Sequence, residues 1–174
     1  MVKSLNDTRL AVARGSFAGL GAGVFLTILM TVMSAASGKD VWYGIKGAAA
    51  PFLGERAMSP GFDLPAVILG LGSHLVISTI WGVLFAMLFF NAGRATTIVG
   101  GVLWGFVVWI GMYYVVLPVV GLSSMQSDAP VGRAIAFHLF FSGAMTAGYA
   151  LYPRLFGGPR ESGHRHIDRS AHAI

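Results

Sequence analysis

Four long apolar stretches recur along this 174-residue chain, and they constrain its fold more than any other feature. They cover residues 15–36, 64–90, 96–120 and 133–152. Each holds the roughly 20 mostly apolar residues that an α-helix needs to cross a bilayer. Only 11% of all residues are charged, against about 25% in a typical soluble domain. The sequence therefore predicts an all-α, polytopic membrane protein with a single four-helix domain over residues 1–152.

The distribution of basic residues predicts how these helices are oriented. Of the 12 Lys and Arg residues, four lie on one side of the expected helices: Lys39, Lys46, Arg56 and Arg133. The other eight lie on the side of the two termini: Lys3, Arg9, Arg14, Arg94, Arg154, Arg160, Arg165 and Arg169. Cytoplasmic segments of membrane proteins are enriched in Lys and Arg. Both termini are therefore expected in the cytoplasm, with the chain in the inner (cytoplasmic) membrane and residues 153–174 forming a basic cytoplasmic tail.

Residues 37–63 form the one long connection between two expected helices. Within it, apolar side chains recur at helical spacing over residues 40–53, which predicts a short interfacial helix lying flat on the outer membrane surface. Pro51 and Gly54 would end that helix. An ordinary loop with scattered apolar residues is the alternative. Three residues would supply the polar positions of the segment: Lys39, Asp40 and Lys46.

The second and fourth stretches share a polar pattern that is rare in membrane helices. His74 is followed by Ser78, and His138 is followed by Ser142, so the two pairs lie 64 positions apart. The first and third stretches also match, Gly19 with Gly101 and Gly23 with Gly105. These matches predict that the chain contains two copies of one helical hairpin, inserted in the same direction and related by an axis along the membrane normal.

The expected membrane interior has few groups that could perform chemistry. Small residues recur at every fourth position, as at Gly15, Gly19 and Gly23, and such stripes pack membrane helices against one another. No acidic or basic residue lies within the expected spans apart from Arg133 at the rim of the fourth. Ion-coupled transport, proton pumping and di-iron chemistry need ionisable groups at depth and are disfavoured. The absence of cysteine excludes disulfides and thiolate metal sites.

The paired histidines allow three interpretations. In the first, His74 and His138 are structural and bond to Ser78 and Ser142, to a carbonyl across the bundle, or to water. In the second, they are the axial ligands of a b-type haem, with small neighbours admitting the porphyrin and Arg133 one turn from His138. Direct helix contact through the same small residues would leave no space for a porphyrin. In the third they bind a metal, but two imidazoles fall short of the ligand set that zinc requires. The sequence favours a protein without a cofactor.

Several short patterns carry a resemblance to a known family. They are the Gly-rich first stretch through Thr27 and Met30, then Leu53-Gly54, His74, His138-Leu139-Phe140-Phe141-Ser142-Gly143 and Tyr149-Ala150. Over residues 15–152 the chain resembles a family of small bacterial and archaeal four-helix membrane proteins, known as a domain of unknown function. The resemblance implies the four-helix topology and no particular activity.

Three functional hypotheses follow, and none of them is an enzyme. The favoured one is a non-catalytic accessory or scaffold subunit of a larger membrane complex, such as a respiratory or other energy-converting complex. An electron-transfer protein with haem b bound by His74 and His138 is the first alternative. A small transporter or lipid-handling protein is the second, and it requires a water-accessible or lipid-filled cavity between the two hairpins. The expected partners are the lipid bilayer and other membrane proteins, and nucleic acid is not expected because the basic residues lie at the ends of the spans.

Overall fold

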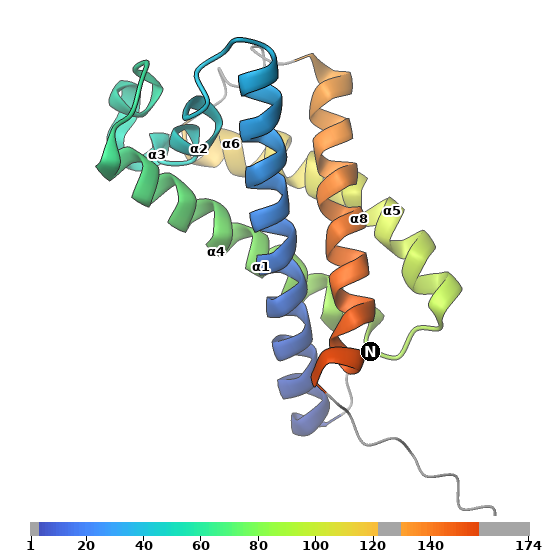
Figure 1. Cartoon of the computed structure of the whole chain (residues 1–174). Helices are drawn as coiled ribbons and strands as arrows, with labels where there is room; N and C mark the ends of the chain where they lie inside the picture. Colours follow the sequence, from blue (N-terminus) through green and yellow to red (C-terminus); the bar gives the residue numbers. More distant parts are fainter. Residues whose placement is uncertain (1–3, 122–129, 157–174) are drawn as a thin grey trace, which may run out of the picture.

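The computed structural model describes residues 4–121 and 130–156, and every regular element in these residues is a helix (Figure 1). Four long helical segments correspond to the four apolar stretches. They are α1 (Leu5–Ala36), α4 (Leu64–Phe89), α5 (Arg94–Gly111) with its continuation through the π-helical turn η2 (Met112–Val116) and α6 (Leu117–Val119), and α8 (Val131–Phe156). Each of the four is long and apolar enough to span a membrane. The prediction of an all-α chain with four helices of membrane-spanning length is therefore confirmed.

The first helix begins earlier than predicted. Helix α1 starts at Leu5 instead of residue 15, because Ser4 caps it. The Ser4 hydroxyl oxygen accepts a hydrogen bond of 3.1 Å from the backbone N–H of Asp7. Hydropathy therefore located the apolar part of this helix, whereas a polar capping group determines where the helix begins.

The last helix extends beyond its predicted end. Helix α8 runs to Phe156, so the first four residues of the predicted basic tail continue the helix, with Arg154 in its last turn. A cation in the last turn interacts favourably with the carbonyl end of the helix. The remainder of the predicted tail, residues 157–174, lies outside the described residues.

The four long helices are unequally packed. Helices α1 and α8 run side by side in opposite directions, α4 packs mainly against α1, and α5 packs mainly against α8 (Figure 1). Helices α4 and α5 contact each other mainly through aromatic side chains, such as Trp81 and Trp104, whose ring centroids lie 5.8 Å apart. We call residues 37–63 the connector, the end of the bundle that it covers the connector end, and the opposite end, where α1 begins and α8 ends, the terminal end.

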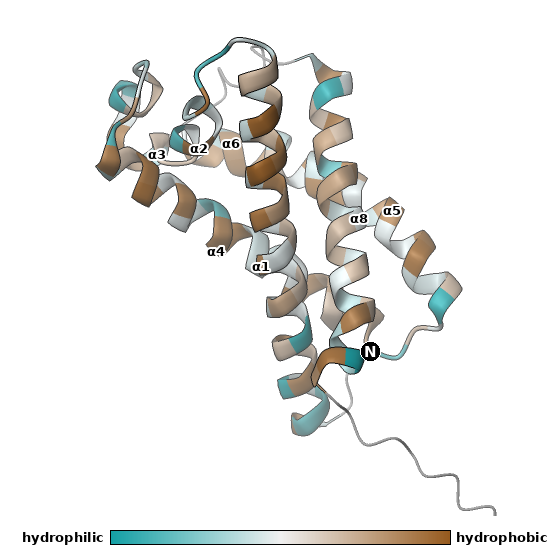
Figure 2. Cartoon of the chain, in the orientation of Figure 1, coloured by the Kyte–Doolittle hydropathy of each residue, from teal (hydrophilic) through white to brown (hydrophobic). Residues whose placement is uncertain are grey.

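Close contact between α1 and α4 depends on glycine. A Cβ atom added to Gly15 would lie 2.6 Å from the carbonyl oxygen of Gly82, and one added to Gly19 would collide with the carbonyl oxygen of Ser78. The two backbones can therefore touch only because side chains are absent, as the predicted stripe of small residues requires. Large apolar side chains face outward along the helices, and most hydrophilic residues lie near the two ends of the bundle (Figure 2).

The connector contains two short helices, α2 (Tyr43–Gly47) and α3 (Ala50–Leu53), followed by the 3₁₀ turn η1 (Gly54–Met58). The predicted helical character of this segment is confirmed, but the predicted effect of Pro51 is wrong. Pro51 lies in the first turn of α3, where a backbone N–H would have no acceptor within the helix. A proline is therefore tolerated there and does not end the helix. Gly54 ends α3 with a φ of +55°, a conformation that glycine adopts readily.

Lys46 corrects a second expectation for the connector. The sequence placed it at a polar surface position, but its side chain is 0% exposed. Its ammonium group donates to the carbonyl oxygens of Ser59 and, at 2.5 Å, Gly61, and it lies 3.7 Å from the Asp40 carboxylate. That carboxylate also accepts hydrogen bonds of 2.9 Å from the backbone N–H groups of Trp42 and Gly61. Lys46 and Asp40 therefore hold the two ends of the connector together.

Candidate functional site

The two histidines lie inside the bundle but bind different partners. On α4, Nε2 of His74 donates to the carbonyl oxygen of Gly23 on α1, at 3.2 Å. On α8, Nδ1 of His138 donates to the carbonyl oxygen of Ala134 one turn earlier in the same helix, at 2.7 Å. The His138 ring also packs edge-on against Tyr113, with centroids 5.9 Å apart.

The serines that follow the histidines are also buried. Ser142 donates from its hydroxyl group to the carbonyl oxygen of Gly101 on α5, which joins the third and fourth spans. Ser78 is 2% exposed and packs against Gly19 and Gly23 of α1. The two imidazoles bond to backbone carbonyls and not to these serines. Of the structural partners expected from the sequence, His74 therefore uses the carbonyl across the bundle.

The two hairpins share some contacts at equivalent positions. A Cβ atom added to Gly23 would lie 3.1 Å from Cδ2 of Leu75, and one added to Gly105 would lie 2.9 Å from Cδ2 of Leu139. Likewise, Gly19 meets Ser78 in the first hairpin, as Gly101 meets Ser142 in the second. These residue pairs are the ones that the sequence offsets relate to one another.

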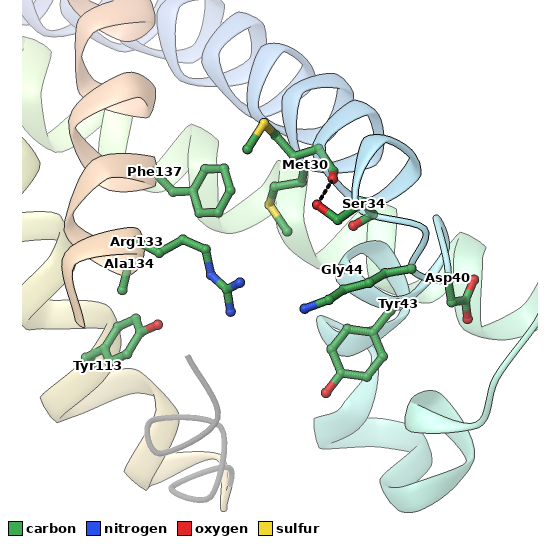
Figure 3. Close-up of a pocket in the computed structure, with 12 residues that line it drawn as sticks. Met30, Ser34, Asp40, Tyr43, Gly44, Tyr113, Arg133, Ala134 and Phe137 are labelled. Carbon is green, nitrogen blue, oxygen red and sulfur yellow. Dashed lines mark hydrogen bonds between the residues drawn. The ribbon is translucent and has the colours of Figure 1, made fainter. Parts of the chain in front are cut away.

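Arg133, the charged residue singled out at the rim of the fourth span, lines a cavity. The cavity lies at the connector end, has a volume of about 500 Å³, and is open on one side (Figure 3). Its walls come from the end of α1, the connector, η2 and the start of α8. The lining residues are Met30, Met33, Ser34, Ser37, Lys39, Asp40, Tyr43, Gly44, Tyr113, Arg133, Ala134 and Phe137.

The charges around this cavity do not balance. The pKa of Asp40 lies below its ordinary value, chiefly because the Trp42 amide donates to the carboxylate; the hydrogen bond from Gly61 and the nearby positive charge of Lys46 act in the same direction. Asp40 is therefore ionised and paired with the buried Lys46 ammonium group. Lys39 and Arg133 are exposed, and within the described part of the chain neither side chain forms an ion pair or a hydrogen bond.

A second cavity adjoins His74 but is very small. Its volume is about 10 Å³, close to the room that one water molecule needs. It shares Met30 and Gly44 with the large cavity, so both cavities are bounded by these two residues. The sequence did not predict which residues line either cavity, because these residues come from segments that are far apart along the chain.

The terminal end contains a cation that the sequence placed outside the first span. Arg14 is half-buried in α1, and its Nε donates to the carbonyl oxygen of Tyr149 on α8, at 2.8 Å. The guanidinium carbon also lies 3.6 Å from the centre of the Tyr149 ring. The Tyr149 hydroxyl group donates to the carbonyl oxygen of Phe89 on α4, at 3.1 Å. These contacts join three helices, and no sequence motif marked Arg14 for this role.

Among residues 4–121 and 130–156, no group of three or more His, Cys, Asp or Glu side chains lies together in a way that could hold a metal ion. Comparison of the chain with models of protein families, with curated proteins and with solved structures found no match. The resemblance to a four-helix family of unknown function stays a prediction.

Proposed function

We propose that the chain is a non-catalytic, multi-pass membrane protein that binds a lipid-like molecule in the cavity at its connector end. The observation that carries this proposal is the cavity itself, which combines apolar side chains such as Met30, Met33 and Phe137 with a polar and charged rim. Ligand sites are commonly concave and mostly apolar, with a few polar groups that orient the ligand. Of the three hypotheses from the sequence, lipid handling is the one that requires such a cavity.

The proposed orientation places the connector outside the cytoplasm. In the sequence, eight of the 12 Lys and Arg residues fall on the side of the two termini, which favours the cytoplasm for both termini of the chain in the inner membrane. The cavity then lies near the outer surface of the membrane, where lipid headgroups meet acyl chains. A molecule with an apolar part and a polar part would find both surroundings there.

We further propose that the two hairpins are copies of one unit, with the cavity at their interface. The equivalent contacts of Gly23 with Leu75 and of Gly105 with Leu139 support this relation. The cavity takes one wall from the first hairpin, through α1 and the connector, and the other from the second, through η2 and α8. Helices α4 and α5 pack less closely against each other than α1 and α8 do. The arrangement of the two hairpins therefore departs from exact two-fold symmetry.

The haem alternative receives less support from the described contacts. Nε2 of His74 is engaged by the carbonyl oxygen of Gly23, and the cavity beside that ring holds about 10 Å³. The backbones of α1 and α4 are in contact along the same face. These observations favour a packing role for the imidazole. An absorption spectrum of the purified protein, with and without reductant, tests the alternative, because bound haem would give a Soret band.

The accessory-subunit hypothesis stays a prediction. Partner proteins would be sought by purifying the chain in native lipid and identifying the chains that co-purify at fixed stoichiometry. Lipid binding and membership of such a complex are compatible, so this measurement does not decide between the two functions, whereas the measurement of ligand binding does.

Filling the cavity tests the proposed function. Ser34 lines the cavity and is half-buried, so Ser34→Trp should occupy part of the space and exclude a ligand. Ala35 is exposed and does not line the cavity, so Ala35→Trp is the matched control. Native mass spectrometry of the full chain, purified from membranes, should find bound lipid on the wild type and on Ala35→Trp, and much less on Ser34→Trp. Equal retention of lipid by all three proteins would contradict the proposal.

A further inference from the structure

We infer that the cavity selects a lipid-like molecule whose headgroup is an anion, and that Lys39 and Arg133 hold this headgroup. The inference rests on the proposed function, since it names the class of ligand for the same cavity. It follows from three features of the lining: its excess of positive charge, the placement of the two cations, and its apolar floor.

The first feature is the charge balance. Three charged residues line the cavity, Lys39, Asp40 and Arg133. The Asp40 carboxylate is already engaged, by two backbone N–H groups and by the buried ammonium group of Lys46. This pair contributes no net charge to the rim. Two positive charges therefore remain for a ligand, and they favour a negatively charged group between them.

The second feature is that the two cations come from different halves of the chain. Lys39 follows the end of α1, and Arg133 lies in the first turns of α8. Arg133 extends from α8 toward the side of the cavity that Tyr43 and Asp40 form (Figure 3). A guanidinium group can donate two parallel hydrogen bonds to a carboxylate or a phosphate, whereas an ammonium group acts as a compact charge. An anion in the cavity could thus contact both halves at once.

The third feature is the apolar floor beneath the charged rim. Met30, Met33 and Phe137 line the cavity together with the charged groups. Methionine side chains are flexible and fill irregular apolar space, so they accommodate chains of varied shape. The volume of about 500 Å³ falls within the range of roughly 300–1,000 Å³ that is common for small-molecule sites. A hydrocarbon chain that ends in an anion matches this lining better than an inorganic anion or a neutral apolar molecule.

Carboxylates and phosphates both have this chemistry, so the experiment compares a fatty acid with a phospholipid. The full chain in detergent is titrated with oleate and with methyl oleate, which has the same hydrocarbon chain without the charge. A second pair is phosphatidylglycerol and phosphatidylcholine. We expect the anionic member of at least one pair to bind about tenfold more tightly than its neutral counterpart, as one charge-assisted contact would give. The pair with the larger ratio identifies the headgroup.

Variants then assign the preference to the two cations. Lys39→Gln with Arg133→Gln should abolish the preference, so that each anionic lipid binds no more tightly than its neutral counterpart. Arg56→Gln is the matched control, because Arg56 is an exposed cation of the same connector that pairs with Asp63 and does not line the cavity. Arg56→Gln should keep the preference.

The failures of the two proposals are distinguishable. If the wild type binds each neutral lipid as tightly as its anionic counterpart, the charge inference is wrong and the proposed function stands. If the double variant keeps the preference, the assignment to Lys39 and Arg133 is wrong. If none of the four lipids binds, the proposed function itself fails. The comparison within the wild type needs no substitution, so a variant that does not fold cannot hide the result.

Discussion

The two ends of the bundle each carry an arginine beside aromatic residues, yet the two arginines have different surroundings. At the terminal end, Arg14 is half-buried, bonds to the Tyr149 carbonyl oxygen and stacks on the Tyr149 ring. At the connector end, Arg133 is exposed, lines an open cavity with Tyr113, and forms no hydrogen bond within the described residues. The first arginine is used for packing, whereas the second is available to a ligand. A basic residue at a span rim can thus have either role, depending on what the neighbouring helix offers.

The packing of the helices explains why one end is closed and the other open. Near the terminal end, the backbones of α1 and α4 touch at Gly15 and Gly82, and Tyr149 bridges α8 to α4. At the connector end, the chain leaves α1 through a long segment that packs on α4, and this segment forms one wall of the cavity. The start of α8 and η2 face it from the other half. The opening therefore depends on the connector keeping its position.

The largest expected effect on stability comes from removing the ion pair that holds the connector in place. Asp40→Asn would remove the counter-charge of the fully buried Lys46 ammonium group. Because a buried charge without its partner is strongly destabilising, we expect the free energy of unfolding of the connector to fall by about 3 kcal/mol. Hydrogen exchange of the amides of residues 43–58 would measure the loss.

Two further variants test the origin of that effect. Combining Asp40→Asn with Lys46→Met should recover much of the lost protection, because it removes the unpaired charge together with its partner. Lys39→Met, at the exposed neighbouring lysine, should change the stability by less than about 0.5 kcal/mol. An Asp40→Asn connector that exchanges as slowly as the wild type would show that the ion pair does not hold this end together.

A smaller loss of stability is expected from a substitution that separates α1 from α4 near the terminal end. In Gly15→Ala, the new Cβ atom would lie 2.6 Å from Gly82 O and from Val83 Cα, so α1 and α4 would have to move apart. Overpacking of this kind costs about 2 kcal/mol. Gly21 of the same helix has nothing within 4 Å of an added Cβ, so Gly21→Ala should not destabilise the protein. Unfolding in detergent, followed by circular dichroism, compares the two; equal stabilities would contradict the close contact.

Features that depend on the residues of one segment could be predicted from the sequence. The four long helices follow from continuous apolar stretches, and the inward face of α1 follows from Gly15, Gly19 and Gly23. The helix start at Leu5 was missed because Ser4 and the polar residues after it carry no hydropathy signal. The local sequence pattern therefore predicted which segments are helical more accurately than it predicted where each helix begins.

Features that depend on several segments could not be predicted. The burial of Lys46 requires carbonyl groups from residues 59 and 61, which only the fold brings to it. The sequence singled out His74 and His138 by their spacing, but their partners differ because one faces Gly23 of α1 and the other bonds within its own helix. The sequence identified Arg133 as a charged residue at the rim of a span. It could not show that Arg133 lines a cavity, because four separate segments form that cavity.

Substituting the two arginines tests the comparison directly. Arg14→Gln would lose the hydrogen bond to the Tyr149 carbonyl oxygen and the contact with the ring, and we expect a loss of about 1–2 kcal/mol. Arg133→Gln should change the stability by less than about 0.5 kcal/mol, because Arg133 is exposed and forms no ion pair or hydrogen bond with the described residues. Thermal unfolding of both variants in the same detergent gives the two values. A loss at Arg133 as large as that at Arg14 would mean that both arginines serve packing.

The smallest effect is a difference in acid sensitivity between the two ends. In the connector, the pKa of Asp40 is lowered chiefly by the Trp42 amide, and that of Asp63 chiefly by the hydrogen bond from Arg56. A carboxyl whose pKa is lower in the folded protein stabilises the fold above its ordinary value of 3.8, and this contribution is lost as the pH falls through the folded pKa. The protection factors of the connector amides, which are exchange rates corrected for the intrinsic pH dependence of amide exchange, should therefore stay constant near neutral pH and fall in acid below pH 3.8. The contact of Arg14 with Tyr149 contains no carboxylate, so its helices should keep their protection over the same range. If both ends lost protection together, the connector would not be an independently held element, and the open cavity could not be attributed to it.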